Sequence, residues 1–224
     1  MPIPNPTLAS ASHLFLARIA SPARGSRSVD LSLGGAPGLA NRDWIDGAYL
    51  TTLPQGAKGL TVALAPAAKT ALAARSAHWV LTYASQADFD LWLQSEVAHI
   101  AALVKQHSPG TFWSVGRAQK FVNILLKYVC AAYYCGIPHF AAFTAANPGV
   151  AALSDYLHAP IDRNTVIHCI SLAPPGHGWG TRYSPLSWWE EMTVPQYLAM
   201  QRTLRGAATA AGMSPIHYEM VYVW

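Results

Sequence analysis

The chain has 224 residues, of which 52% are hydrophobic and only 12% are charged. This length is enough for one domain with a substantial core or for two small domains. No apolar run reaches the roughly 18 residues that a membrane-spanning helix requires. The apolar segment from Leu14 to Ala20 is interrupted by Arg18 and has no basic residue before it, unlike a signal peptide. We therefore expect a cytoplasmic protein that is not bound to a membrane.

The cysteines and the charges narrow the class of protein further. Cys130, Cys135 and Cys169 lack the spacing of metal ligands, so we expect them in the core and predict neither a metal nor another cofactor. The formal net charge is +4, and no Asp or Glu occurs from Val97 to Ser154. A surface built from this region would favour a polyanion, although a chain with so few charges could contain such a gap by chance.

The first eighty residues carry weak signals of secondary structure. A helix is predicted from Thr7 to Ala20, and the Gly-, Pro- and Ser-rich residues 21–59 are expected to form loops. Within them we allow only short strands, around Val29–Leu33 and Tyr49–Leu53. Since no long periodic segment occurs here, we expect residues 1–80 to cover a helical core formed by residues 85–224.

A helix is predicted from about Pro66 to Arg75, because proline suits the first turn of a helix. The five residues Trp79–Tyr83 have a strand-like composition and could form a short strand or a helix end. Ser85 can cap a helix whose apolar residues recur at spacings of three and four until Ser108. The segment from about Gly116 to Cys135 is the longest apolar stretch without a proline, so it is predicted to be the central buried helix.

The remaining elements are also helical. Further helices are predicted over Phe140–Ala146, up to Leu157, over Asp162–Leu172, over Thr193–Gly212 and over Ser214–Trp224. The sequence therefore predicts a mostly α-helical single domain, residues 1–224, with roughly eight helices.

A loop between two of the predicted helices contains Trp179, Trp188 and Trp189. These side chains could stack a nucleic-acid base or, more often in proteins, close off a core.

Two segments within residues 114–163 resemble the helix-hairpin-helix DNA glycosylases. Val115-Gly116-Arg117, followed by Lys120 and an apolar helix, resembles the glycine-rich hairpin and second helix of that family. Ala159-Pro-Ile-Asp162 is similar to the family's segment in which an aspartate caps the next helix. The archaeal 8-oxoguanine branch, with a lengthened helix between lysine and aspartate, is the most similar in this respect.

The resemblance implies an enzyme that removes a damaged or modified base from double-stranded DNA after flipping it out of the helix. Lys120 would attack the sugar C1′ and form a Schiff base, with the helix N-terminus and Arg117 favouring its neutral amine. Asp162 would stabilise the cationic sugar or activate the nucleophile. An ungapped match from Val115 instead places Ala118 at the lysine position, which leaves Asp162 as the essential residue of a monofunctional enzyme.

The same interpretation assigns residues to DNA binding. Gly116, Arg117 and Lys127 would contact phosphates, since a glycine allows close approach and the basic side chains neutralise charge. The base pocket would be built from aromatic side chains, and the candidates are Trp113, Trp179, Trp188 and Trp189.

Two other classes of protein remain open. Arg163-Asn164 with His168 fits the Arg-polar-x-x-x-His motif of HEPN ribonucleases, helical proteins that usually dimerise and cleave RNA without a metal. His168 could equally be a hydrogen-bonded side chain on the inner face of its helix. The third possibility is a non-catalytic helical module that binds a partner through its tryptophan loop. A glycosylase requires Lys120 and Asp162 to face one pocket, whereas the ribonuclease requires Arg163 and His168 at a dimer interface.

Overall fold

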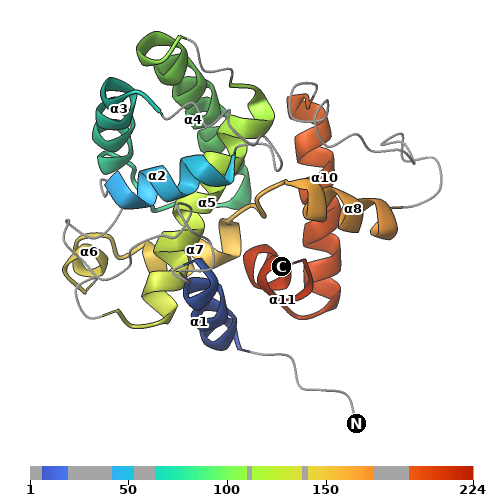
Figure 1. Cartoon of the computed structure of the whole chain (residues 1–224). Coiled ribbons are helices and arrows are strands. Elements are labelled where there is room, and N and C mark those ends of the chain that lie inside the picture. The colour runs from blue at the N-terminus through green and yellow to red at the C-terminus, as the bar shows by residue number, and fades with distance from the viewer. Residues whose placement is uncertain are drawn as a thin grey trace.

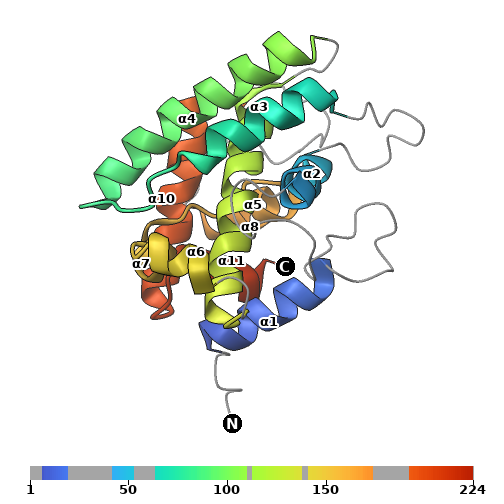
Figure 2. The ribbon, with the colours of Figure 1, turned by 90° about the vertical axis from the view of Figure 1, so that its left-hand side faces the viewer.

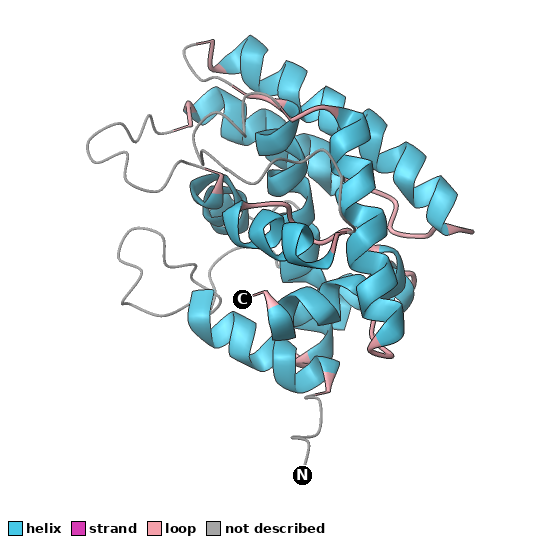
Figure 3. Ribbon diagram, turned by 90° about the vertical axis from the view of Figure 1, so that its right-hand side faces the viewer, coloured by secondary structure: helices cyan, strands magenta, loops and turns pink. Residues whose placement is uncertain are grey.

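The computed structural model describes residues 7–19, 42–52, 64–109, 113–137, 141–173 and 192–223. Within these ranges all regular elements are α-helices and no strand occurs (Figure 3), which confirms the mostly α-helical fold class. The helices are α1 (Leu8–Ile19), α2 (Arg42–Thr51), α3 (Pro66–Ala77), α4 (Gln86–His107), α5 (Val115–Tyr134), α6 (Ala141–Ala146), α7 (Val150–Tyr156), α8 (Arg163–Leu172), α10 (Val194–Ala210) and α11 (Pro215–Tyr222). None of these described helices is long and apolar enough to span a membrane.

Helix α5 runs through the middle of the molecule, with the other helices arranged around it (Figures 1 and 2). It begins one residue earlier than the pattern indicated, because the Ser114 hydroxyl accepts a hydrogen bond from the amide of Arg117 and caps the first turn. Every residue from Ala118 to Ala132 is buried. Helices α1, α2, α4 and α7 pack directly against it. The prediction of a central buried helix is confirmed.

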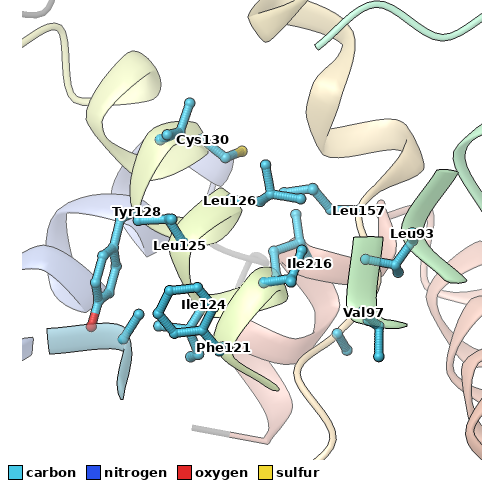
Figure 4. Close-up of a cluster of buried hydrophobic side chains, with 14 of the residues drawn as sticks. Leu93, Val97, Phe121, Ile124, Leu125, Leu126, Tyr128, Cys130, Leu157 and Ile216 are labelled. Atoms are coloured by element: carbon cyan, nitrogen blue, oxygen red, sulfur yellow. The ribbon is translucent and has the colours of Figure 1, made fainter. Parts of the chain in front are cut away.

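Side chains leave α5 in several directions to join the core (Figure 4). Leu126 points toward Leu157, and Tyr128 points away from it toward the N-terminal helices. The Tyr128 ring lies 5.9 Å from Phe15 of α1 and 6.1 Å from Trp44 of α2, measured between ring centroids. These aromatic contacts anchor α1 and α2 on α5.

Two local predictions were wrong. Tyr49 lies in α2 and not in a strand, because Trp44, Ile45 and Ala48 form with it a buried helical face. Residues 79–83 form neither a strand nor a helix end. They are an extended linker in which Trp79 and Leu81 are buried while Val80 is exposed, so the alternation typical of a strand occurs without a partner strand among the described residues. The strand suggested at residues 29–33 lies outside the described residues.

Gly149, at the N-terminus of α7, marks a close contact between this helix and the linker. A Cβ added there would lie 2.2 Å from the carbonyl oxygen of Leu81 and 2.9 Å from its carbonyl carbon. We expect Gly149→Ala to lower the free energy of unfolding by about 1–3 kcal/mol, because the backbone must move apart. Chemical denaturation followed by circular dichroism would measure the change.

Gly206 in α10 provides the matched control for this substitution. A Cβ at Gly206 would have no atom within 4 Å. Gly206→Ala is therefore expected to raise the free energy of unfolding by about 0.5–1 kcal/mol, since glycine loses more backbone entropy in a helix. Equal effects of the two alanines would contradict the close contact at Gly149.

Candidate active site

One side of α5 carries polar residues although the helix is buried. Gln119, Lys120, Asn123 and Lys127 fall within an arc of about 100° around the helix axis, given 3.6 residues per turn. We call these four residues the α5 polar seam. Burying polar groups is unfavourable unless they find partners. The partners of the seam therefore define the candidate site.

Lys120 and Asp162 meet at one end of the seam. The distance between Lys120 Nζ and Asp162 Oδ2 is 3.4 Å, and the two side chains are 11% and 17% exposed. The structure thus brings together the two residues that the resemblance pairs, although they lie 42 positions apart in the sequence. Lys120 is in the second turn of α5, not the first as expected. The two groups form an ion pair, so the Lys120 ammonium must lose a proton before its amine can act as a nucleophile.

Asp162 is held in place by the helix that it precedes. Its Oδ1 accepts hydrogen bonds from the backbone amides of Asn164 and Thr165, at 3.0 and 3.1 Å, and from the Thr165 hydroxyl at 3.2 Å. The predicted cap of α8 is confirmed. Since the helix N-terminus engages Oδ1, the other carboxylate oxygen is the one within reach of Lys120.

The segment that leads to Asp162, residues 157–161, is buried but has no regular secondary structure. Side-chain amides take the place of a neighbouring strand. Gln119 donates to the carbonyl of Ile161 at 2.9 Å and accepts from its amide at 3.4 Å. Gln201 makes the same pair of bonds to Ala159, at 2.7 and 3.1 Å. These bonds satisfy the buried backbone groups and fix the path of the chain into Asp162.

A chain of buried hydrogen bonds continues from Gln119 into the core. Asn123 Nδ2 donates to Gln119 Oε1 at 3.1 Å and to the Tyr197 hydroxyl at 2.9 Å. The Tyr197 hydroxyl lies 2.6 Å from His158 Nδ1, and His158 Nε2 lies 2.7 Å from Asp90 Oδ1. We call these five residues the buried relay.

Arg205 closes the outer end of the buried relay. Its Nη2 donates to Asp90 Oδ1 at 2.8 Å and also contacts His158 Nε2. Asp90 and Arg205 are each about one quarter exposed, whereas His158 is fully buried. The relay therefore extends from a partly exposed ion pair to the residue next to Lys120.

The hydrogen bonds of the relay are those of a neutral histidine. His158 donates from Nε2 to Asp90 and accepts at Nδ1 from the Tyr197 hydroxyl, which in turn accepts from Asn123. Burial lowers the pKa of His158, and the charge of Arg205 acts in the same direction, whereas Asp90 opposes it. Burial alone would raise the pKa of Asp90, but the hydrogen bonds from His158, Arg205 and Gln86 hold it far below its usual range.

The lowered pKa of His158 predicts a loss of stability in mild acid. Below about pH 6.5 the unfolded chain protonates this histidine while the folded chain does not, so the unfolded state binds more protons. The free energy of unfolding should then fall by up to about 1.4 kcal/mol per pH unit as the pH decreases toward the pKa of the folded state. His158→Gln, measured by urea denaturation at pH 7.5 and 5.5, should lack this contribution, whereas His99→Gln at an exposed position of α4 should retain it.

The structure corrects the predicted DNA-binding set. Lys127 is fully buried against Glu219, and Gly116 is buried with its carbonyl bonded to Gln119 Nε2 at 2.8 Å, so neither is placed to contact a phosphate. Arg117 is half-buried in the first turn of α5. The pattern could not separate Lys127 from Arg117, because both are basic residues on an apolar helix.

Trp113 is the part of the predicted base pocket that the structure describes. Its ring stacks on Tyr49 with centroids 6.1 Å apart and meets Phe121 edge-on at 5.5 Å, so it packs against the core. It directly precedes the Ser114 cap of α5. Trp179, Trp188 and Trp189 lie outside the described residues.

The residues of the ribonuclease motif lie on α8. Arg163 is exposed at the start of the helix, while His168 Nε2 lies 3.0 Å from the Tyr218 hydroxyl and its ring packs on the tyrosine. Five positions on a helix separate two side chains by about 140° around the axis. The sequence left open that His168 is a hydrogen-bonded side chain, and its contact with Tyr218 agrees with that interpretation.

The chain matches no known family model, no curated protein and no solved structure. In the described part of the chain, no group of three His, Cys, Asp or Glu side chains could hold a metal ion. The candidate site is accordingly defined by its geometry: a lysine and a helix-capping aspartate in contact, joined to the buried relay. The sequence did not reveal the relay, since its members are spread from residue 90 to residue 197.

Proposed function

We propose that the protein is a DNA glycosylase that removes a damaged or modified base. The observation that carries the proposal is the contact of Lys120 Nζ with Asp162 Oδ2 at the N-terminus of α8. Glycosidic bond cleavage produces a cationic sugar, which an adjacent carboxylate stabilises, and an amine beside that carboxylate can serve as the nucleophile. Both side chains are partly exposed, at 11% and 17%.

In the bifunctional form of the reaction, the lone pair of Lys120 Nζ forms a bond to C1′ of the sugar. The bond between C1′ and the base breaks, and its electron pair leaves with the base. Asp162 takes the proton that Nζ must lose, which a carboxylate oxygen 3.4 Å away is placed to do. In the monofunctional form, a water molecule replaces Nζ as the nucleophile and Asp162 takes the proton from that water.

The surroundings of the pair are compatible with nucleic acid. Arg163 is exposed beside Asp162, and Arg117 lies half-buried one turn before Lys120. Binding to DNA is expected to weaken as the salt concentration rises, because basic side chains release counterions from the phosphates they neutralise.

The proposal is tested with duplex DNA that carries one candidate base per substrate, beginning with an oxidised purine. We expect release of the base from at least one substrate, and borohydride should trap a covalent adduct if Lys120 forms a Schiff base. Base release without an adduct would assign the monofunctional form. No release from any member of a panel of oxidised, alkylated, deaminated and phage-type modified bases would contradict the proposal.

The same assay distinguishes the other two classes of protein. A ribonuclease would cleave RNA without a metal and lose this activity in Arg163→Ala or His168→Ala, while Lys120→Ala would leave it unchanged. Binding without any chemistry on DNA or RNA would indicate a non-catalytic module.

A further inference from the structure

Gln119 connects the two halves of the candidate site. It directly precedes Lys120 on α5, and its side chain binds both backbone groups of Ile161, the residue before Asp162. Gln119 is fully buried, and its Nε2 also donates to the carbonyl of Gly116. One side chain thereby links the backbone that carries Lys120 to the backbone that carries Asp162.

The orientation of this glutamine is fixed by the buried relay. Gln119 Oε1 accepts from Asn123 Nδ2, and the same nitrogen donates to the Tyr197 hydroxyl. Tyr197 is 3% exposed and bonded to His158, whose Nε2 donates to Asp90, and Asp90 in turn accepts from Arg205. Rotation of the Gln119 amide would place its nitrogen against Asn123 and its oxygen against the Ile161 carbonyl, and both contacts would be unfavourable.

We propose that the buried relay is a positioning network that holds Asp162 at Lys120, with Gln119 as its last member and Tyr197 as its central link. The role of the network in a reaction depends on the proposed glycosylase function, whereas its control of the Lys120 to Asp162 distance does not. The relay itself delivers no proton to the site, because Asn123 Nδ2 is a donor to both of its neighbours and interrupts proton transfer.

Tyr197→Phe tests the network with the loss of one oxygen atom. The ring keeps its place in the core, while His158 loses a partner and Asn123 keeps only Gln119. We expect Asp162 to become less constrained and Lys120 to react more readily with an acylating reagent. The probe is N-hydroxysuccinimidyl acetate, with the extent of acetylation at each lysine read by mass spectrometry of proteolytic fragments.

Two other lysines serve as internal references in the same sample. Lys105 is exposed and reports the reactivity of a freely accessible amine, and Lys127 is fully buried against Glu219 and reports general loosening of the core. Labelling of Lys120 relative to Lys105 should rise several-fold in Tyr197→Phe, while labelling of Lys127 stays unchanged. A constant ratio for Lys120, or an equal rise at Lys127, would overturn the inference.

Tyr134→Phe is the matched control variant. Tyr134 is the last residue of α5, and its hydroxyl lies 3.1 Å from Ser154 Oγ and 3.2 Å from the carbonyl oxygen of Ala151, far from Lys120 along the helix. Its Lys120 labelling should equal that of the parent. Gln119→Met, which keeps the length of the side chain but loses both bonds to Ile161, should raise Lys120 labelling at least as much as Tyr197→Phe.

Base release gives the second readout. In single-turnover assays Tyr197→Phe should slow release by about 10- to 100-fold with less than a twofold change in the Kd for DNA, since a small displacement of a reacting group acts on the rate and not on binding. If Tyr197→Phe raises the labelling of Lys120 but the parent protein releases no base, the positioning network stands and only the proposed function is contradicted. Unchanged labelling with intact base release would overturn the network and not the function.

Discussion

Asp162→Asn is expected to slow base release by about 10²- to 10⁴-fold, the range associated with loss of a positioned acid or base. Asparagine has nearly the same shape as aspartate but carries no charge, so it neither stabilises a cationic sugar nor takes a proton from Lys120. Asparagine is also among the best residues for capping a helix, and Asp162 caps α8. The substitution therefore removes the chemistry and keeps the local structure, which single-turnover assays and thermal unfolding would show together.

Asp155→Asn on α7 is the control for this substitution. It removes the same charge at an exposed position seven residues earlier in the sequence. Base release by Asp155→Asn should match the parent within about twofold. Parent-like release by Asp162→Asn would exclude Asp162 from the chemistry. Lys120→Ala distinguishes an amine nucleophile from a water nucleophile. This variant should lose any borohydride-trapped adduct. If it still releases the base, water is the nucleophile.

Helix positions were predictable where capping residues and apolar periodicity agreed. Ser85 caps α4 through the amide of Asp88, and Thr193 forms a capping box with Gln196 at the start of α10, both visible in the sequence. Helix α2 was missed because Gly47 and the Gly-rich residues around it indicated loops, although its buried residues have helical spacing. Its stability comes from packing on α5, which local sequence does not report.

The candidate site was predictable only where its chemistry coincides with a local motif. The cap at Asp162 follows from its place before a helical pattern, and its meeting with Lys120 was suggested by the resemblance. The relay depends on contacts between residues far apart in the sequence, such as Asp90 with His158, 68 positions away. Each member has a common local explanation of its own, so only the tertiary arrangement shows that they are connected.

The buried pair of Lys127 and Glu219 yields the largest expected effect on stability. Lys127 Nζ lies 2.5 Å from Glu219 Oε2 and 4.2 Å from the centre of the Phe15 ring, and both charged side chains are fully buried. Burial lowers the pKa of Lys127, and the charge of Glu219 opposes that shift. Removing one partner leaves an unpaired charge in a fully buried site, which destabilises proteins by about 3–5 kcal/mol.

Lys127→Met is accordingly expected to lower the free energy of unfolding by about 3–5 kcal/mol, measured by urea denaturation. The double variant with Glu219→Leu should recover most of this loss, because apolar residues of similar volume replace a buried ion pair at little net cost. Lys69→Met, which breaks a pair with Asp46 that is about one third exposed, should change stability by less than about 1 kcal/mol. If Lys127→Met lowered the free energy of unfolding no more than Lys69→Met does, Lys127 would have to reach solvent. Its exclusion from the DNA-binding surface would then be wrong as well, so this measurement tests the position of the lysine and its contribution to the fold together.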